Sequence, residues 1–214
     1  MQNTKTVIVD YGMGNMFSVQ RACASAGLDA ALTSDRRELE SAAAAILPGV
    51  GAFGPAMENL ARLDLVGPLR DFCASGRPFL GICLGFQLLF TESEEFGANK
   101  GLDILKGAVR KFPLPNREQA KVPQIGWNLI SRRGAWDGTP LEGLADGEYM
   151  YFVHSFYVQP DSSVPPASVT SYAGVDYASS VSRGKLFACQ FHPEKSAWNG
   201  LRIYQNFKRQ VTGE

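Results

Sequence analysis

A cysteine between two glycines is the first place where this sequence could perform covalent chemistry. Cys83 is the centre of GICLG (residues 81–85), a pattern typical of a sharp turn in which a strand leads into a helix and exposes a nucleophile. Glycines on both sides avoid the clash that larger residues would make in such a strained turn. The helix that follows would aim its free N–H groups and the positive end of its dipole at the sulfur, which favours the reactive thiolate. The alternative is a buried structural cysteine that happens to lie between glycines.

Two residues near the C-terminus could complete an acyl-transfer site with this cysteine. His192 and Glu194 follow the apolar run 186–191, and Pro193 fixes the backbone between them. Residues i and i+2 of an extended backbone project to the same side. A carboxylate beside an imidazole orients the ring, and an imidazole beside a thiol takes its proton and later gives it to a leaving amine. Alone, a histidine at a strand end is more often structural, but together with Cys83 the pair predicts a catalytic triad.

The second histidine is a rival general base. His154 lies inside the aromatic stretch 149–158 and has no acidic residue two positions away. We therefore interpret it as a residue that lines or packs against the pocket, with Ser155 and Phe156 as backbone contacts for a substrate.

A glycine-rich loop could provide part of an oxyanion hole. The segment 48–54 (PGVGAFG) follows an apolar strand and cannot be helical, so it exposes backbone N–H groups. We expect the N–H of Leu84 to be one oxyanion donor and the peptide around Val50 and Gly51 to be the second. The alternative is a plain turn between a strand and a helix.

The first part of the chain alternates strands and helices. A strand over 6–10 leads through the turn 11–15 into a helix over 16–26, but the full G-x-G-x-x-G signature of dinucleotide binding is absent. We interpret that turn as a loop at the ligand-facing edge of a parallel sheet. Strands are expected at 30–34, 43–47 and 79–82, with helices from about 55, from about 65 and over 84–94.

Strands dominate the last third of the chain. An edge strand is expected at 109–112, a polar loop at 113–121 and an irregular, surface-shaping segment around Trp127 at 122–128. The strands that follow are expected at 149–158, 169–172, 178–182 and 186–191, before a helix over 199–211. The sequence therefore predicts an α/β fold with a mostly parallel sheet and an antiparallel C-terminal flank, in one domain over residues 1–214.

Composition narrows the classes of function. Hydrophobic residues make up 45% and charged residues 20% of the 214 positions, and 21 basic residues balance 21 acidic ones. This is typical of a globular protein in water, and it argues against nucleic acid or an anionic membrane as a partner. We find no signal peptide and no apolar run long enough to cross a bilayer. The spacing of the four cysteines fits neither a zinc site nor a small disulfide framework, so we expect no metal, no other cofactor and a reducing, cytoplasmic setting.

Three of these segments together resemble a known family. GICLGFQLLF, PGVGAFG and FHPEKS are similar to the class I, triad-type glutamine amidotransferases, and the resemblance covers essentially the whole chain. Within that class, VDYGMGN, VPQIGWN and YFVHSFYV are similar to glutaminase subunits that pass ammonia to a (β/α)₈ cyclase, which makes the imidazole ring of histidine. The resemblance implies a flavodoxin-like three-layer fold and a heterodimer with that cyclase.

The resemblance also implies roles for individual residues. Cys83 would attack the side-chain amide of L-glutamine, while His192, oriented by Glu194, would move the protons. The oxyanion donors would be Leu84, Gly49, Val50 and Gly51, and the substrate contacts would be Gln87, Glu95, Ser155 and Phe156. The face toward the cyclase would include Gly12, Met13, Gly14, Asn15, Trp127, Asn128, Tyr151 and Lys195. We expect the lone subunit to be nearly inactive until partner and acceptor complete its oxyanion hole.

Other functions fit parts of the pattern. A paralogous glutaminase could supply a different barrel that amidates a surface sugar, and nothing in the triad separates the two; copurification with one barrel would. A cysteine-elbow peptidase or chaperone has a similar topology, although Glu194 beside His192, and Gln87 one turn past the nucleophile, argue against it. A non-enzymatic regulatory module is disfavoured by the complete triad.

Overall fold

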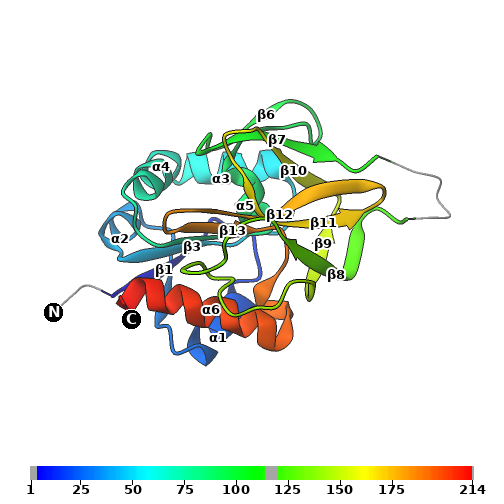
Figure 1. The fold of residues 1–214 in the computed structure, drawn as a ribbon. Coiled ribbons are helices and arrows are strands. Elements are labelled where there is room, and N and C mark those ends of the chain that lie inside the picture. Colours follow the sequence, from blue (N-terminus) through cyan, green and yellow to red (C-terminus); the bar gives the residue numbers. More distant parts are fainter. Residues whose placement is uncertain (1–3, 114–119, 214) are drawn as a thin grey trace.

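The computed structural model describes residues 4–113 and 120–213 (Figure 1). Among these residues, nine strands form a central sheet in the order β2-β1-β3-β4-β13-β12-β11-β8-β9, and four form a smaller sheet in the order β10-β7-β5-β6. Neighbouring strands from β2 to β13 are parallel, and those from β13 to β9 are antiparallel. The predicted α/β fold, with its antiparallel C-terminal flank, is confirmed.

The parallel half of the central sheet consists of short buried strands. All four residues of β1, β3, β4 and β13 are buried, as expected where helices cover both faces. The parallel strands are β1 (Thr6–Val9), β2 (Ala30–Thr33), β3 (Ala44–Leu47), β4 (Phe79–Ile82) and β13 (Leu186–Cys189). The antiparallel flank comprises β8 (Gln124–Arg132), β9 (Glu148–His154), β11 (Pro166–Tyr172) and β12 (Val175–Arg183).

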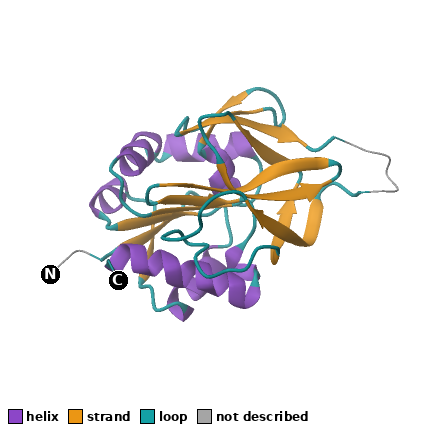
Figure 2. Ribbon diagram, in the orientation of Figure 1, coloured by secondary structure: helices purple, strands orange, loops and turns teal. Residues whose placement is uncertain are grey.

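Helices cover both faces of this sheet (Figure 2). On one face lie α1 (Met16–Ser25) and α6 (Ala197–Thr212); on the other lie α2 (Arg36–Ser41), α3 (Phe53–Arg62) and α4 (Val66–Ala74). The sequence prediction missed α2, because six residues are too few for a clear period. Asp35 marks its start, since the carboxylate accepts hydrogen bonds from the N–H groups of Arg37 and Glu38.

The segment after Cys83 corrects two sequence predictions. The predicted helix over 84–94 is wrong: α5 spans only Leu84–Leu88, and the chain continues as β5 (Phe90–Ser93). The strand predicted over 109–112 is present as β7 (Leu105–Lys111), but its predicted edge position is wrong, because β7 pairs with β5 on one side and with β10 (Phe156–Pro160) on the other. The two edges of this smaller sheet are instead β10 and β6 (Asn99–Lys100).

Two further predictions change in the antiparallel flank. The predicted single strand over 149–158 is wrong, because the chain leaves β9 at His154, turns at Ser155 and enters the smaller sheet as β10. The irregular segment predicted around Trp127 is part of β8, and its residues 124–130 pair with β9. The first correction matters for the site, because the turn at Ser155 lies in the same pocket as Cys83.

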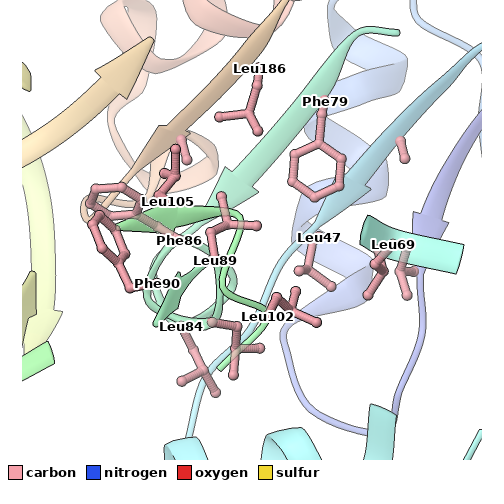
Figure 3. Packing of buried hydrophobic residues seen from close by; sticks show 14 of the residues in the cluster. Leu47, Leu69, Phe79, Leu84, Phe86, Leu89, Phe90, Leu102, Leu105 and Leu186 are labelled. Carbon is pink, nitrogen blue, oxygen red and sulfur yellow. The ribbon is translucent and has the colours of Figure 1, made fainter. Parts of the chain in front are cut away.

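The core consists of two clusters, one on each face of the central sheet. One cluster packs α2, α3, α4 and the smaller sheet against the central sheet, with large side chains such as Phe79, Phe86 and Phe90 fully buried (Figure 3). The other packs α1 and α6 against the opposite face. The strands that carry the candidate triad are therefore held between two apolar layers.

Candidate active site

Cys83 lies at the sharp corner between β4 and α5. Its φ is +54°, a left-handed conformation that non-glycine residues rarely adopt. A Cβ atom at Gly85 would lie 1.8 Å from the carbonyl oxygen of Leu47, and one at Gly81 would lie 3.0 Å from the Cβ of Ala188. Close packing around the elbow therefore requires glycine at position 85 and leaves little room for a side chain at position 81.

The strand topology brings His192 and Glu194 to the same edge of the sheet. β13 is the parallel neighbour of β4, and the N–H of Cys83 donates a 2.8 Å hydrogen bond to the carbonyl of Cys189. Three residues later, the N–H of His192 binds the carbonyl of Tyr151 on β9 at 2.9 Å. A 3₁₀ turn over Pro193–Lys195 then presents Glu194. The carboxyl ends of adjacent parallel strands thus place all three side chains at one site.

The imidazole and the carboxylate form a buried pair. His192 Nδ1 is 2.7 Å from Glu194 Oε1, and each side chain is only 2% exposed. Burial lowers the pKa of His192, but the neighbouring Cys83 and Glu194 outweigh it and raise that pKa to about 10. His192 Nε2 has no hydrogen-bond partner among the described residues, so it is the nitrogen available for proton transfer. The pair is therefore suited to hold a protonated ring beside a thiolate.

Two polar groups approach the sulfur from the neighbouring strands. The Sγ atom of Cys83 is 3.9 Å from the carbonyl oxygen of Val153 on β9. On the other side, Nε2 of Gln190, just past the end of β13, lies 3.6 Å from Sγ. Gln190 was not predicted from the sequence, although a polar residue that ends an apolar strand next to a candidate base is a usable signal.

The predicted oxyanion donors lie together, but the N–H of Leu84 is already occupied. The N–H of Leu84 donates to the carbonyl of Gly49 at 3.3 Å. A Cβ at Gly49 would lie 2.1 Å from the hydroxyl of Tyr11, so only glycine fits this position of the loop. Gly51 has φ of +115°, and Val50 between the two glycines is 40% exposed.

A pocket of about 290 Å³ opens at the sulfur. It contains all four predicted substrate contacts, and its lining consists of Val50, Gly51, Cys83, Leu84, Gln87, Glu95, Pro123, Val153, His154, Ser155 and Phe156. Glu95 Oε2 accepts a 2.7 Å hydrogen bond from the N–H of Phe53, at the start of α3. Burial raises the pKa of Glu95, and the Phe53 N–H partly opposes that shift. The pocket therefore combines a nucleophile with an anionic group at its far side.

His154 supports the wall of this pocket. Its Nδ1 is 2.8 Å from the carbonyl oxygen of Phe156, so the neutral ring carries its proton on Nδ1, and its Nε2 is 3.2 Å from the hydroxyl of Tyr177. Burial lowers the pKa of His154 to about 4. A ring that is neutral and fixed on both sides fits the pocket-lining role expected from the sequence.

The residues predicted to face a partner lie beside the site. The turn that contains Gly12, Met13, Gly14 and Asn15 lies against the oxyanion loop, because a Cβ at Gly14 would be 3.6 Å from the Cα of Gly49. Asn128 accepts a hydrogen bond from Gln124 at 2.9 Å. The rings of Trp127 and Tyr151 meet edge to face at 6.1 Å, and Lys195 Nζ lies 5.7 Å from the Tyr151 ring.

Several exposed apolar side chains of β8 and β9 extend this surface. Ile125 is 63% exposed, Trp127 49% and Leu129 43%, and Tyr149 on the paired strand is 55% exposed. We call these four residues the β8–β9 patch. Only Trp127 of these four was predicted from the sequence, because the alternation of exposed and buried residues along β8 becomes clear only with the strand register. Elsewhere in the described part of the chain, no cluster of residues that could hold a metal and no helix suited to crossing a membrane is found.

Comparison with known proteins places this geometry in a family. The model of the glutamine amidotransferase class-I family matches residues 7–210. The chain is 48% identical over 200 residues to the imidazole glycerol phosphate synthase subunit HisH of Rhodopirellula baltica, covering 94% of this chain and 95% of the relative. It is 45% identical over 208 residues to the subunit of the same name from Aquifex aeolicus, covering 97% of each.

Solved structures support the same fold at lower identity. A putative GMP synthase protein from Thermoplasma acidophilum superposes with a TM-score of 0.70 at 21% identity, covering 98% of this chain and 94% of that one. A PurLQS structure from Thermotoga maritima gives 0.71 at 18% identity, covering 97% and 98%. Since the family model and the relatives both span nearly the whole chain, the chain belongs to the class-I glutamine amidotransferases and, within them, to the HisH subunits of imidazole glycerol phosphate synthase.

Proposed function

We propose that this chain hydrolyses L-glutamine to L-glutamate and ammonia in the cytoplasm, and that it passes the ammonia to a (β/α)₈ cyclase that forms imidazole glycerol phosphate and AICAR in histidine biosynthesis. One observation carries the catalytic part: a strained elbow cysteine lies beside a buried histidine whose Nδ1 is 2.7 Å from a buried carboxylate. The pathway is inferred from the name that both relatives share.

The chemistry divides into two steps at the sulfur. Cys83 as thiolate attacks the amide carbon of glutamine, and His192 gives its proton to the nitrogen as ammonia leaves, so that a γ-glutamyl thioester remains. His192 then takes a proton from water, the resulting hydroxide attacks the thioester, and glutamate and the thiolate are released. Glu194 keeps the ring oriented and stabilises its protonated form in both steps.

The glycine-rich loop 48–54, here called the oxyanion loop, holds the enzyme in an inactive resting state. An oxyanion that forms next to Cys83 needs the N–H of Leu84, but the carbonyl of Gly49 accepts that hydrogen bond at 3.3 Å. Rotating the peptide between Gly49 and Val50 would remove this carbonyl and present the N–H of Val50 instead. The glycines on either side of Val50 make such a rotation sterically feasible.

The substrate's amino-acid end fits the far side of the pocket. Glu95 would bind the ammonium group, since its carboxylate is half-buried and already oriented by the Phe53 N–H. Backbone groups at Ser155 and Phe156 and the side chain of Gln87 line the path back to Cys83. A cation bound there would counteract the burial that raises the pKa of Glu95.

The partner would cover the β8–β9 patch. Four large exposed apolar side chains on two paired strands are unusual for a surface that always faces water. Tyr151 pairs with Trp127 of the patch and lies beside Lys195, and the turn at Gly12–Asn15 touches the oxyanion loop through Gly14 and Gly49. A cyclase that presses on this turn could therefore favour the rotated peptide, which couples its own state to glutaminase activity.

Glutamate release from the mixed subunits tests the proposal. The chain alone should release glutamate slowly, and addition of a histidine-pathway cyclase with its nucleotide substrate should accelerate release. The Cys83→Ser variant in the same mixture is the control for other glutaminases. Full activity of the isolated chain would overturn the resting state, and activation only by a sugar-amidating barrel would move the chain to the paralogous pathway.

A further inference from the structure

A chain of two buried amides leads from the pocket wall to the catalytic sulfur. The Nε2 of Gln87 donates to the carbonyl of Phe156 at 2.9 Å and to Oε1 of Gln190, also at 2.9 Å. The Nε2 of Gln190 in turn lies 3.6 Å from Sγ of Cys83. Gln190 is fully buried and Gln87 is 5% exposed, so both contacts are largely shielded from water.

The backbone fixes the direction of this amide chain. The carbonyl of Phe156 can only accept, so Gln87 must turn its NH₂ group toward it. That same NH₂ group meets Gln190, which must therefore present its oxygen to Gln87 and its own NH₂ group to the sulfur. Reversing Gln87 would place two acceptors against each other, and reversing Gln190 would place its NH₂ group against the NH₂ group of Gln87, in a buried site. The orientation of Gln190 thus follows from the network and does not depend on distinguishing oxygen from nitrogen in one side chain.

The two neighbours of the sulfur favour different protonation states. A neutral thiol can donate to the carbonyl of Val153, at 3.9 Å, whereas a thiolate would be repelled by that oxygen. Gln190 offers the opposite contact, because its N–H can donate to the anion. A hydrogen bond to a charged acceptor in a buried site is stronger than one to a neutral acceptor.

We propose that Gln190 is a catalytic residue that donates a hydrogen bond to the Cys83 thiolate, and that Gln87 and the Phe156 carbonyl hold it in the donating orientation. This inference rests on the proposed function of Cys83 as nucleophile. It adds a stabilising group to the anion that exists before attack and again after the thioester is hydrolysed. It also gives Gln87 a second task beyond contact with substrate.

Alkylation of Cys83 by iodoacetamide tests the proposal without glutamine or a partner, because only the thiolate reacts. The rate is measured against pH for the full chain and for Gln190→Met, which has similar length and no donor, with the modified residue identified by mass spectrometry. Other titratable groups near the sulfur or in its pocket stay the same in this variant: His192, Glu194, Cys189, Tyr11, Tyr177, His154 and Glu95. Gln159→Met, an exposed position on β10, is the matched control.

The expected result is a shift of the alkylation midpoint to higher pH by about one unit in Gln190→Met, with a rate about tenfold lower near neutral pH. Gln87→Met should shift it less, because Gln190 keeps its donor but loses its orientation. An unchanged midpoint in a folded Gln190→Met variant, judged by circular dichroism, would overturn the proposal. If Gln190→Met does not fold, an unchanged midpoint in Gln87→Met overturns it instead. If both variants show the expected shifts of the alkylation midpoint but the wild-type complex releases no glutamate, the glutaminase function is refuted. The hydrogen bond from Gln190 to the thiolate would still be supported.

Discussion

At the residue scale, Cys83 should separate two activities of the complex. In Cys83→Ser the hydroxyl is a much weaker nucleophile than a thiolate, so glutamine-dependent turnover should fall by at least about 10³-fold. Turnover with free ammonium should persist, because the cyclase does not need the elbow. Both rates are measured on the reconstituted complex. Retained glutamine-dependent activity would show that another residue is the nucleophile.

His154 should make the protein sensitive to acid. Burial lowers its pKa from 6.5 to about 4, so the folded state resists a proton that the unfolded state accepts. Stability is therefore full above about pH 6.5 and declines as the pH falls toward 4, by about 3 kcal/mol in total. Urea unfolding at pH 7 and pH 4 measures this loss.

His154→Gln provides the comparison for that loss. The variant lacks the titrating ring, so it should lose about 3 kcal/mol less than the wild type between the two pH values. Carboxylates that titrate in the same range are common to both proteins and cancel in the difference. Equal losses in the two proteins would mean that His154 is already protonated in the folded state.

Residue types and spacing predict Cys83, His192 and Glu194 as a triad, because each lies in a motif with a local physical meaning, and the structure places His192 against Glu194. Gln190 was missed because its role depends on what lies opposite it, and Gln87, Phe156 and Cys83 approach it from other segments. The carbonyl of Gly49 in front of Leu84 could not be predicted either, since a glycine allows both orientations of its peptide.

At the element scale, the elbow should not tolerate a single methyl group. In Gly85→Ala the new Cβ would lie 1.8 Å from the carbonyl oxygen of Leu47, a backbone atom that cannot move independently of β3. We expect a loss of about 2 kcal/mol or more in the free energy of unfolding, together with loss of glutaminase activity. Thermal and urea unfolding measure the first effect.

Gly134→Ala is the matched control for the elbow glycine. Gly134 has no atom within 4 Å of its added Cβ and no positive φ. The substitution should be neutral or stabilise the fold by up to about 1 kcal/mol, because alanine restricts the unfolded chain. Similar stability of the two variants would contradict the close packing of α5 against β3.

Helices and strands could be predicted where the hydrophobic period was long. The predictions failed where tertiary contacts determine the secondary structure. The apolar run from Leu88 to Phe90 fits a helix as well as a strand. Leu88 ends α5, and pairing with β7 places Phe90 in a strand. The aromatic stretch around Ser155 reads as one strand, yet the chain crosses from one sheet to the other there. That corner positions the Phe156 carbonyl at the start of the amide chain.

At the scale of the whole molecule, the β8–β9 patch should control assembly. Trp127→Ala removes a large, half-exposed ring that would be buried by a partner, so the cyclase should bind about 10- to 100-fold more weakly. Titration calorimetry with the purified cyclase measures the affinity. The unfolding midpoint of the isolated chain should change little.

Leu32→Ala is the control for that surface. Leu32 is 41% exposed, close to the 49% of Trp127, but it lies on β2 at the opposite edge of the central sheet. Its substitution should leave the affinity unchanged. Equal weakening by both variants would mean that the partner binds elsewhere. The predicted partner contacts at Asn128, Tyr151 and Lys195 would then be refuted together with the β8–β9 patch.

The Gly49 carbonyl in front of Leu84 has a consequence for how the two proteins can be produced. A glutaminase that was always switched on would degrade cellular glutamine whenever it outnumbered its cyclase. Under the proposed resting state, surplus copies of this chain would be harmless. A cell that carries it would then not need to match the expression of the two genes, and released nitrogen would be confined to complexes that hold an acceptor.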